Sequence, residues 1–363
     1  MTAHALDVAV DERDRTSAVA PDVHVTRVVA GECGEWRRLS RQLGGHLAHA
    51  PEWSTVIQET YGHEPLYLLA TDEVGPGGLL PAFIVRRPLI GAAVTSMPFL
   101  DGGGPRSASP AMTTGLVNGL IAQAHRIGAS VVELRCQERL PVAWQPMEHK
   151  VNQVLPLPPD PEKLWHRLDR TVRNQVRKAH RSGLCVEFGG LERLDAFYAI
   201  FSNRMRELGS PVHDREFFRS ILTRFAGQAR IAVVQNGATP IGGMLMLASN
   251  NVLTVPWASC LSRYSTLCPN MLLYWEAIRA GCLEGRARFD FGRSTRGSGT
   301  HHFKRQWGAD EIPLYWYTIP IKGRSTFSPG AGATSSRLAD VWKRLPLSVT
   351  RHLGPRVRKY LIQ

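Results

Sequence analysis

Residues 288–308 form the stretch of this sequence that is most informative about chemistry. The letters RFDFGRSTRGSGTHHFKRQWG describe a short strand, a polar loop with glycines, basic residues and histidines, and then an aromatic pair. Loops of this kind, held by a rigid fold, commonly carry reacting groups. We take Asp290, His301 and Lys304 as candidate catalytic residues and Arg293 as a candidate substrate-binding residue. The alternative for Asp290 and Arg293, three residues apart, is that they pair with each other.

A second candidate is the basic segment Arg170–Arg181, RTVRNQVRKAHR. Small apolar residues recur on one face of the predicted helix, Arg173 and Arg177 recur on another, and Gly183 supplies a stop signal. Guanidinium groups one turn apart suit phosphate or carboxylate because each offers a planar fork of donors. The two arginines are therefore candidate substrate-binding residues, with a solvated basic face as the alternative.

A third candidate is the crossing from a strand into a helix within residues 255–275. Asn270 is expected to cap that helix. Backbone donors gather where a strand ends and a helix begins, and anions and acyl groups tend to bind there. Ser259, Tyr264, Asn270 and Tyr274 of this crossing are therefore candidate substrate-binding residues.

The elements that must position these residues fall into two similar runs. The first run is predicted as helices 35–43 and 52–61, strand 65–70, a glycine turn at 75–78, strands 79–85 and 92–98, helix 110–127 and strand 130–135. The second run is predicted as helices 170–181, 191–208 and 215–225, strands 229–234, 241–247 and 252–258, helix 271–282 and strand 288–291. An Asn236–Gly237 pair between two apolar runs predicts a hairpin. The shared order favours duplication of one α+β unit, with a coincidence of common elements as the alternative.

These patterns divide the chain into four parts. Residues 1–22 mix charges and small residues without periodicity and are predicted to be a disordered tail. Residues 23–155 and 156–320 are the two predicted domains, and the prolines between Pro156 and Pro161 mark the linker. Residues 321–363 form a basic tail with nine Lys and Arg residues and one acid, Asp340.

The net charge of +13 is concentrated in that tail and in residues 163–181. Such density favours a polyanionic partner, namely tRNA, a nucleotide or lipid pyrophosphate, or an anionic membrane face, and the alternative is a solvated basic surface. Apolar residues of the tail, such as Trp342 and Leu345, could rest on a bilayer.

Composition also narrows the compartment. The six cysteines form no Cys-x-x-Cys pair and the thirteen histidines no His-x-x-x-His pair, so neither a zinc frame nor a disulfide scaffold is predicted, and a reducing cytosol fits best. The first twenty residues include Asp7, Asp11, Glu12 and Asp14, where a signal peptide would have a continuous apolar run. No apolar stretch of about 18 residues occurs in the sequence. The expected location is cytoplasmic, with peripheral contact at the inner face of the membrane through the tail.

Several segments together resemble the FemAB-related branch of the GNAT-like acyltransferases. They are TVRNQVRKAHRSG, ASCLSRYSTLCPNMLLYWEAI and FDFGRSTRGSGTHHFKRQWG in the second half, GLLPAFIVRRPLIGAAVTSMPFLDGGGP in the first half, and WKRLPLSVTRHLGP in the tail. The likeness spans roughly residues 23–355 and concerns above all the FemAB-related proteins associated with exosortase (PEP-CTERM) and exopolysaccharide gene systems.

The resemblance implies an α+β fold made of a tandem pair of GNAT-like domains. It also implies a transferase that moves an acyl or aminoacyl group to an amine of a cell-envelope precursor, such as a peptidoglycan or exopolysaccharide precursor. The donor would be acyl-CoA or aminoacyl-tRNA, with no metal or other bound cofactor. Both donors stay open, because neither a glycine between Val255 and Arg279 nor a long heptad run for a tRNA-binding arm occurs here.

Within the resemblance, HHFKRQWG is similar to the FemAB segment whose Phe and Lys pair lies at the acyl-transfer site. This implies substrate binding by Phe303, and it implies that Lys304 stabilises the developing oxyanion or holds the donor's phosphate. The alternative is a surface lysine beside a packed phenylalanine. We expect a cleft between the two domains, lined by Arg173, Arg177, Tyr264 and Lys304.

Two functions without catalysis remain as alternatives. The chain could be a non-catalytic member of a membrane-associated polysaccharide assembly complex, anchored by its tail, or an RNA-binding module. The polar groups crowded into residues 288–308 favour an enzyme over a scaffold. The usual RNA modules carry interleaved aromatic and basic residues on their strands, a pattern that this sequence lacks.

Overall fold

The structure is a computed structural model that describes residues 23–29, 34–88, 90–321 and 336–361. The predicted disordered tail, residues 1–22, lies outside the described residues. The elements of the first half are β1 (His24–Val28), α1 (Gly34–Gln42), the 3-10 helix η2 (Leu47–His49), α2 (Glu52–Tyr61), β2 (Glu64–Pro65), β3 (Tyr67–Asp72), β4 (Gly75–Leu80), β5 (Phe83–Arg87), β6 (Gly91–Thr95), β7 (Arg106–Ser107), α3 (Pro110–Arg126), β8 (Val131–Cys136) and β9 (Met147–Pro156).

The second half contains α4 (Pro161–Arg167), α5 (Arg170–Arg181), β10 (Leu184–Gly189), η3 (Leu191–Arg193), α6 (Leu194–Glu207), α7 (Arg215–Arg224), β11 (Ala229–Asn236), β12 (Thr239–Ser249), β13 (Val252–Cys260), η4 (Ser262–Leu267), α8 (Pro269–Leu283), β14 (Arg288–Thr295), α9 (Gly299–Arg305) and β15 (Asp310–Pro320). Two further helices, α10 (Ser336–Arg344) and α11 (Leu347–Arg358), follow near the C-terminus.

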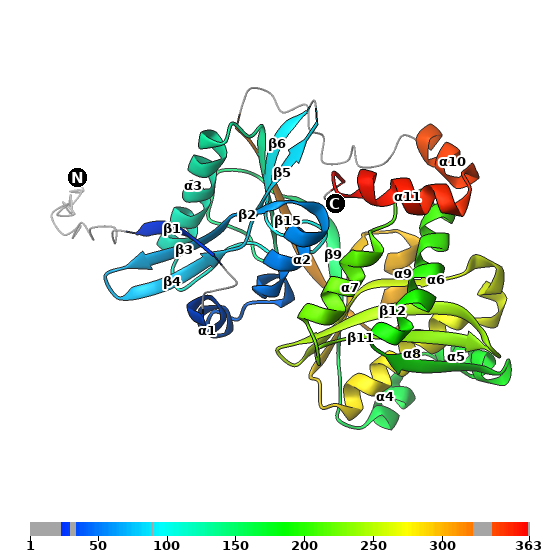
Figure 1. Ribbon diagram of the computed structural model, residues 1–363. Coiled ribbons are helices and arrows are strands. Elements are labelled where there is room, and N and C mark those ends of the chain that lie inside the picture. The colour runs from blue at the N-terminus through cyan, green and yellow to red at the C-terminus, as the bar shows by residue number, and fades with distance from the viewer. Residues whose placement is uncertain (1–22, 30–33, 89, 322–335, 362–363) are drawn as a thin grey trace, which may run out of the picture.

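One large sheet runs through both halves. Its strand order among the described residues is β10-β11-β12-β13-β14-β9-β15-β8-β6-β5-β2, and a smaller sheet has the order β1-β3-β4-β7. In Figure 1 the first half is blue to cyan, the second half is mainly green to yellow, and the red C-terminal helices lie against the second half.

The two halves repeat one topological unit. In the first half β5 and β6 are antiparallel, α3 follows, and β8 then pairs with β6 in parallel. In the second half β11, β12 and β13 are antiparallel, α8 follows, and β14 then pairs with β13 in parallel. This confirms the predicted pair of similar α+β units.

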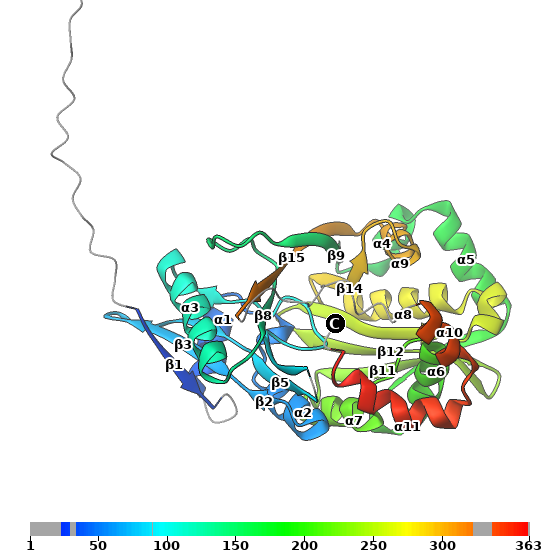
Figure 2. The same ribbon diagram turned by 90° about the horizontal axis from the view of Figure 1, so that it is seen from above.

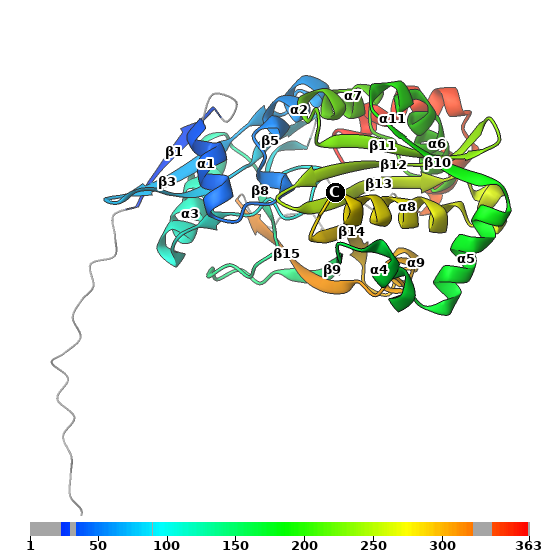
Figure 3. The same ribbon diagram turned by 90° about the horizontal axis from the view of Figure 1, so that it is seen from below.

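The halves exchange their last strands. Strand β9 follows β8 in the chain but pairs with β14, whereas β15 follows β14 and pairs with β8. The two exchanged strands also pair with each other, and Figures 2 and 3 show them running between the halves. Because the sheet is continuous across this junction, the domain limits at residues 155/156 and 320/321 remain predictions.

Local sequence signals explain several boundaries that were predicted. Helix α5 has the expected bounds because Asp169 caps it by accepting a hydrogen bond from the Thr171 N–H, and Gly183 follows at φ 76°. The predicted β11–β12 hairpin is present, with Asn236 as the last residue of β11, paired with Thr239, and Gly237 in the turn at φ 58°.

Four local predictions were wrong. The polar loop after residue 291 is instead the rest of β14 and the short helix α9, which Ser298 caps, and β14 extends because it pairs with the unpredicted β9. The predicted strand 79–85 is divided at Pro81 between two sheets, and Gly75–Gly78 belongs to β4. Helix α8 begins at Pro269, and Cys268 in the left-handed region holds the N-cap position expected for Asn270.

An aromatic cluster joins the halves on one side of the sheet. The ring centres of Trp53 and Phe225 are 4.9 Å apart, and those of Tyr61 and Phe217 are 5.4 Å apart. Such pairs add to the free energy gained by burying apolar area. The relative position of the halves is therefore held both by this cluster and by the exchanged strands.

The described part of the basic tail is folded, while residues 322–335 lie outside the described residues. Helix α11 contacts α6, and Thr350 and Gly354 of α11 are buried. Among the described residues, no helix combines the length and apolar character that crossing a membrane requires.

Candidate active site

Strands β13 and β14 are paired only at one end, and the candidate site lies where they separate. Val252–Thr254 pair in parallel with Arg288–Asp290, and the pairing stops there. Gly292 follows at φ 71°, and a side chain at this position would meet the Val255 carbonyl oxygen at 3.0 Å. Glycine therefore permits both the backbone conformation and the close approach to β13.

A cavity of about 460 Å³ occupies the junction of the two halves. Residues from both halves and from α11 line it, including His46, Phe99, Asp101, Asn152, His213, Trp257, Arg288, Asp290, Arg293, Lys304 and Arg358. A pocket of this size between two domains, with several convergent polar groups, is the usual form of a small-molecule site.

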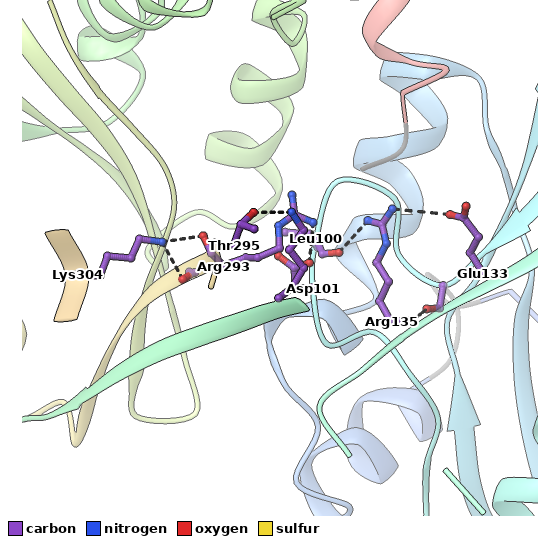
Figure 4. Close-up of polar contacts among 10 residues, drawn as sticks. Leu100, Asp101, Glu133, Arg135, Arg293, Thr295 and Lys304 are labelled. Atoms are coloured by element: carbon purple, nitrogen blue, oxygen red, sulfur yellow. Dashed lines mark hydrogen bonds and ion pairs between the residues drawn. The ribbon is translucent and has the colours of Figure 1, made fainter. Parts of the chain in front are cut away.

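Lys304 is buried at the edge of this cavity. Its Nζ donates to the carbonyl oxygens of Gly292 and Arg293, both at 2.8 Å (Figure 4). Burial lowers the pKa of Lys304 to about 8, against the opposing effect of Asp290 and Asp101. Two of the three ammonium donors hold the backbone of β14, which leaves the third for a ligand.

Asp290 lies beside Lys304 and has the opposite shift. One carboxylate oxygen accepts from the Gly292 N–H at 2.8 Å, and the other accepts from Asn152 Nδ2 at 3.4 Å. Burial raises the pKa of Asp290 to about 6, opposed by the Gly292 N–H and by Lys304. An acid and a base whose pKa values move toward neutrality from opposite sides are suited to proton transfer.

An ion pair links the two halves across the cavity. Arg293 Nη1 lies 3.1 Å from Asp101 Oδ1, and its guanidinium is centred 5.0 Å from the Trp316 ring. Arg135 lies 4.9 Å from the same ring and donates to the Leu100 carbonyl oxygen at 3.2 Å. Figure 4 shows the contacts in a line from Lys304 to Glu133.

The loop that carries Asp101 is strained. Met97 and Phe99 have φ angles of 48° and 72°, in the left-handed region that residues other than glycine rarely adopt. Both side chains are buried, so packing holds the conformation. Backbone strain of this kind is concentrated at binding and catalytic sites.

Two histidines of the cavity are neutral. Burial and Arg106 lower the pKa of His46 to about 3, and burial and Arg358 hold the pKa of His213 well below its usual value. Their imidazoles can accept or donate hydrogen bonds without carrying charge.

Of the eleven candidate residues, three line the cavity: Asp290, Arg293 and Lys304. Their roles stay predictions. The predicted cleft between the domains exists, but of the four residues expected to line it only Lys304 does so.

The other candidates lie elsewhere in the second half. Arg173 and Arg177 are on α5, where Arg177 stacks 5.5 Å from Trp165. Asn270 is exposed on α8, and Tyr264 is partly buried on η4. Ser259 is buried on β13.

Three further candidates pack behind the cavity. Tyr274 is buried, with its ring 5.5 Å from Phe291 and 5.1 Å from Phe303. His301 is buried on α9, where Nε2 lies 2.7 Å from Glu311 Oε1 and Nδ1 accepts from the Gly297 N–H. These contacts position α9, and with it Lys304.

Sequence reasoning missed the residues that the cavity receives from distant segments. His46, Asn152 and His213 had no local signal. Asp101 lies in the quoted segment SMPFLDGGGP, where its place among glycines after an apolar strand was an available signal. Arg358 was counted only as one of many basic tail residues.

Among the described residues, no group of three or more His, Cys, Asp or Glu side chains could hold a metal ion.

Comparison with known proteins supports the fold. Residues 166–305, less than half of the chain, match the acetyltransferase (GNAT) domain family. The chain is structurally similar to FemX, with a TM-score of 0.63 and 11% identity over 82% of this chain and 97% of FemX. No curated protein matches it in sequence.

Two other solved structures are also similar. L-PGS from Bacillus licheniformis has a TM-score of 0.53 and 12% identity over 90% of this chain and 96% of its own. A tandem GNAT protein from the clavulanic acid biosynthesis pathway has a TM-score of 0.52 and 9% identity over 83% of this chain and 99% of its own. The fold is thus a tandem pair of GNAT-like domains, as the resemblance implied, and the exosortase-associated branch remains a hypothesis.

The raised pKa of Asp290 predicts that this carboxylate lowers stability above acidic pH. Because its pKa rises from 3.8 to about 6 on folding, the folded chain holds this proton more tightly than the unfolded chain does. The free energy of unfolding therefore decreases as pH increases through that interval. Asp290→Asn should therefore melt at a higher temperature than wild type at pH 7, and the gain should shrink below pH 4. The amide can keep the Gly292 N–H bond, and Asn152 Oδ1, buried without a partner, can accept from it if the Asn152 amide turns over.

Thermal unfolding followed by circular dichroism from pH 3.5 to 8 measures this effect. Asp310→Asn, at an exposed position on β15, is the control for loss of a carboxylate. Equal melting temperatures of the Asp290→Asn variant and wild type at every pH would contradict the interpretation.

Proposed function

We propose that the chain is an N-acyltransferase or aminoacyltransferase, of the acyl-transfer class of transferases, that acylates an amine of a cell-envelope or polysaccharide precursor. Transfer takes place in the cavity between the two GNAT-like domains. The observation that carries the proposal is the Asp290 and Lys304 pair at the edge of this cavity, with pKa values of about 6 and about 8.

The reaction requires three things of the protein. The attacking amine must lose a proton, the carbonyl oxygen of the acyl group must be stabilised as it gains charge, and both substrates must be held in position. Asp290 accepts the proton, and the remaining N–H of Lys304 donates to the oxyanion. The new C–N bond forms as the C–S bond of a thioester donor, or the C–O bond of an aminoacyl ester, breaks, and the thiol or hydroxyl of the donor leaves with the proton that Asp290 accepted.

The identity of the donor is a separate part of the proposal. The match of residues 166–305 to the GNAT domain supports acyl-CoA, whereas the resemblance to FemAB-related proteins supports aminoacyl-tRNA. Arg173 and Arg177 lie on α5 rather than on the cavity, so in this proposal they contact an extended part of the donor outside it. Ribonuclease sensitivity of the activity in an extract distinguishes the tRNA donor.

The alternative is a non-catalytic member of a polysaccharide assembly complex. Burying charged groups costs free energy unless they are paired or used. A scaffold gains nothing from Asp290 and Lys304 buried beside an open cavity. We therefore favour the enzyme.

Lys304→Ala should lower the rate of transfer about a hundredfold to a thousandfold, because it removes a preorganised donor to the oxyanion. Mass spectrometry of envelope and polysaccharide precursors compares cells without the gene, with wild type and with the variant at equal protein levels. The mass added in wild type identifies the transferred group.

Lys150→Ala is the matched control, because Lys150 of β9 donates to Thr295 of β14, the strand that Lys304 also contacts, at 2.7 Å but does not line the cavity. Its product level should stay within about threefold of wild type. Identical precursors with and without the gene would favour the non-catalytic alternative. Normal product in the Lys304→Ala variant would show that the reacting carbonyl lies elsewhere.

The transfer rate should depend on pH in two steps. It should rise as Asp290 ionises, with a midpoint of about 6, and fall as Lys304 loses its proton, with a midpoint of about 8. Initial rates measured from pH 5 to 9 with the identified donor test this. Asp290→Asn should remove the acidic step, and a rate that is constant over the whole range would contradict both roles.

The C-terminal helices also support peripheral binding to an anionic membrane, at a cytoplasmic site of action. Leu338, Val341, Leu353 and Val357 are each at least 39% exposed, and basic side chains of α10 and α11 lie among them. Apolar residues that enter a lipid surface beside cations gain from both burial and charge attraction.

Replacing Leu338 and Val341 together by Gln should weaken binding to anionic liposomes in a flotation assay at low salt. Val74→Gln, at a position that is 96% exposed in the first half, should leave binding unchanged. Equal flotation of the double variant and wild type would remove these two residues from the membrane-binding surface.

A further inference from the structure

Helix α11 bridges both halves next to the cavity. On the second half, Arg351 Nε donates to Ser202 Oγ at 2.8 Å, and Gly354 packs so closely that a side chain there would meet the Val212 backbone nitrogen at 3.0 Å. On the first half, His63 Nε2 donates to the Lys359 carbonyl oxygen at 2.9 Å. The end of this helix is therefore held from two sides, as its position in Figure 2 also indicates.

Arg358, the last residue of α11, reaches the cavity wall. Its Nε donates to Nε2 of His213 at 3.2 Å, and its guanidinium is centred 5.7 Å from the ring of Phe99. His213 can accept this bond because it is neutral. The imidazole and the aromatic ring orient the guanidinium, which comes from a segment more than a hundred residues away in sequence.

Positive charge accumulates around this position. Among the described residues that line the cavity, the cationic side chains are Arg288, Arg293, Lys304 and Arg358, and the carboxylates are Asp101 and Asp290. Arg293 and Arg135 are close enough to contribute to the lowered pKa of Arg358, after the larger effect of burial. A surplus of cations in an enclosed space attracts a multiply charged anion.

We propose that Arg358 binds a phosphoryl group of a substrate in the cavity, with Arg293 as the neighbouring cation. A guanidinium presents a planar fork of donors that matches phosphoryl oxygens, and the surplus charge matches a phosphate better than a single carboxylate. This inference rests on the proposed function in one respect, that the phosphoryl group belongs to the acyl donor or to a pyrophosphate-bearing acceptor. The C-terminal helix thus completes the substrate site.

Isothermal titration calorimetry of the full chain with inorganic pyrophosphate tests the proposal. Wild type should bind saturably. Arg358→Gln should raise the Kd about tenfold or more, as expected for loss of a charge-assisted contact. Arg358→Lys should recover only part of the affinity, because an ammonium cannot form the fork. Arg356→Gln, exposed on the same helix, removes the same charge and should bind as wild type does.

Equal weakening in the Arg358→Gln and Arg356→Gln variants, or absence of saturable binding to wild type, would overturn the proposal. Circular dichroism checks that each variant is folded. If Arg358→Gln does not fold, Arg358→Lys decides the question, and an unchanged Kd in that variant overturns the proposal.

Two further titrations distinguish the source of the phosphoryl group. Loss of affinity for coenzyme A in Arg358→Gln assigns the contact to a donor, and loss of affinity for geranyl pyrophosphate assigns it to a lipid pyrophosphate acceptor. Loss with neither counts against the proposal. These titrations measure binding and not transfer. If the chain binds pyrophosphate but mass spectrometry finds no acylated precursor, the proposed function is refuted and this binding site still stands.

Discussion

The exchange of β9 and β15 between the two halves is the constraint on which the rest of the structure depends. Each half must accept a strand from the other to complete its part of the sheet, so the halves cannot rotate apart without breaking backbone hydrogen bonds. The same exchange brings Asn152 of β9 beside Asp290 of β14. The sheet and the site are thus formed by one set of pairings.

The pairing of β14 with its two neighbouring strands is irregular next to the site. The parallel pairing of β13 with β14 ends at Asp290, and the register between β14 and β9 shifts between Asp290 and Arg293. The carbonyl oxygens freed by this irregularity need donors, and Lys304 supplies them from α9. A buried ammonium is tolerated there because it satisfies backbone acceptors and lies near a carboxylate.

The cavity combines contributions with different physical origins. Asp101 is held by a strained loop, Lys304 by contacts to the backbone, and Arg358 by a helix that packs on both halves. These supports also contact one another, because Arg358 lies over the ring of Phe99 in the strained loop and Lys304 bonds the carbonyl oxygen of Arg293, the partner of Asp101. The arrangement places several buried charges around one cavity, and burying these charges costs free energy. A site for charged substrates explains this cost better than a structural role does.

The sequence by itself determined part of the local structure and part of the site. The pattern of neighbouring residues predicted α2 and α5, and the Asn236–Gly237 pair predicted the hairpin between β11 and β12, because these elements depend on residues close together in the sequence. Asp290, Arg293 and Lys304 were found together because they belong to one short segment.

Only the tertiary structure decided that β9 and β15 change places and that Asp101 and Arg358 meet Arg293's segment. It also decided that α5 carries Arg173 and Arg177 away from the cavity, although the spacing of these residues had predicted a shared helix face correctly. Periodicity shows which side of a helix is buried, but it does not specify which distant segment covers that side or where the opposite side points. Those outcomes depend on pairing and packing between residues far apart in the chain, which no local pattern records.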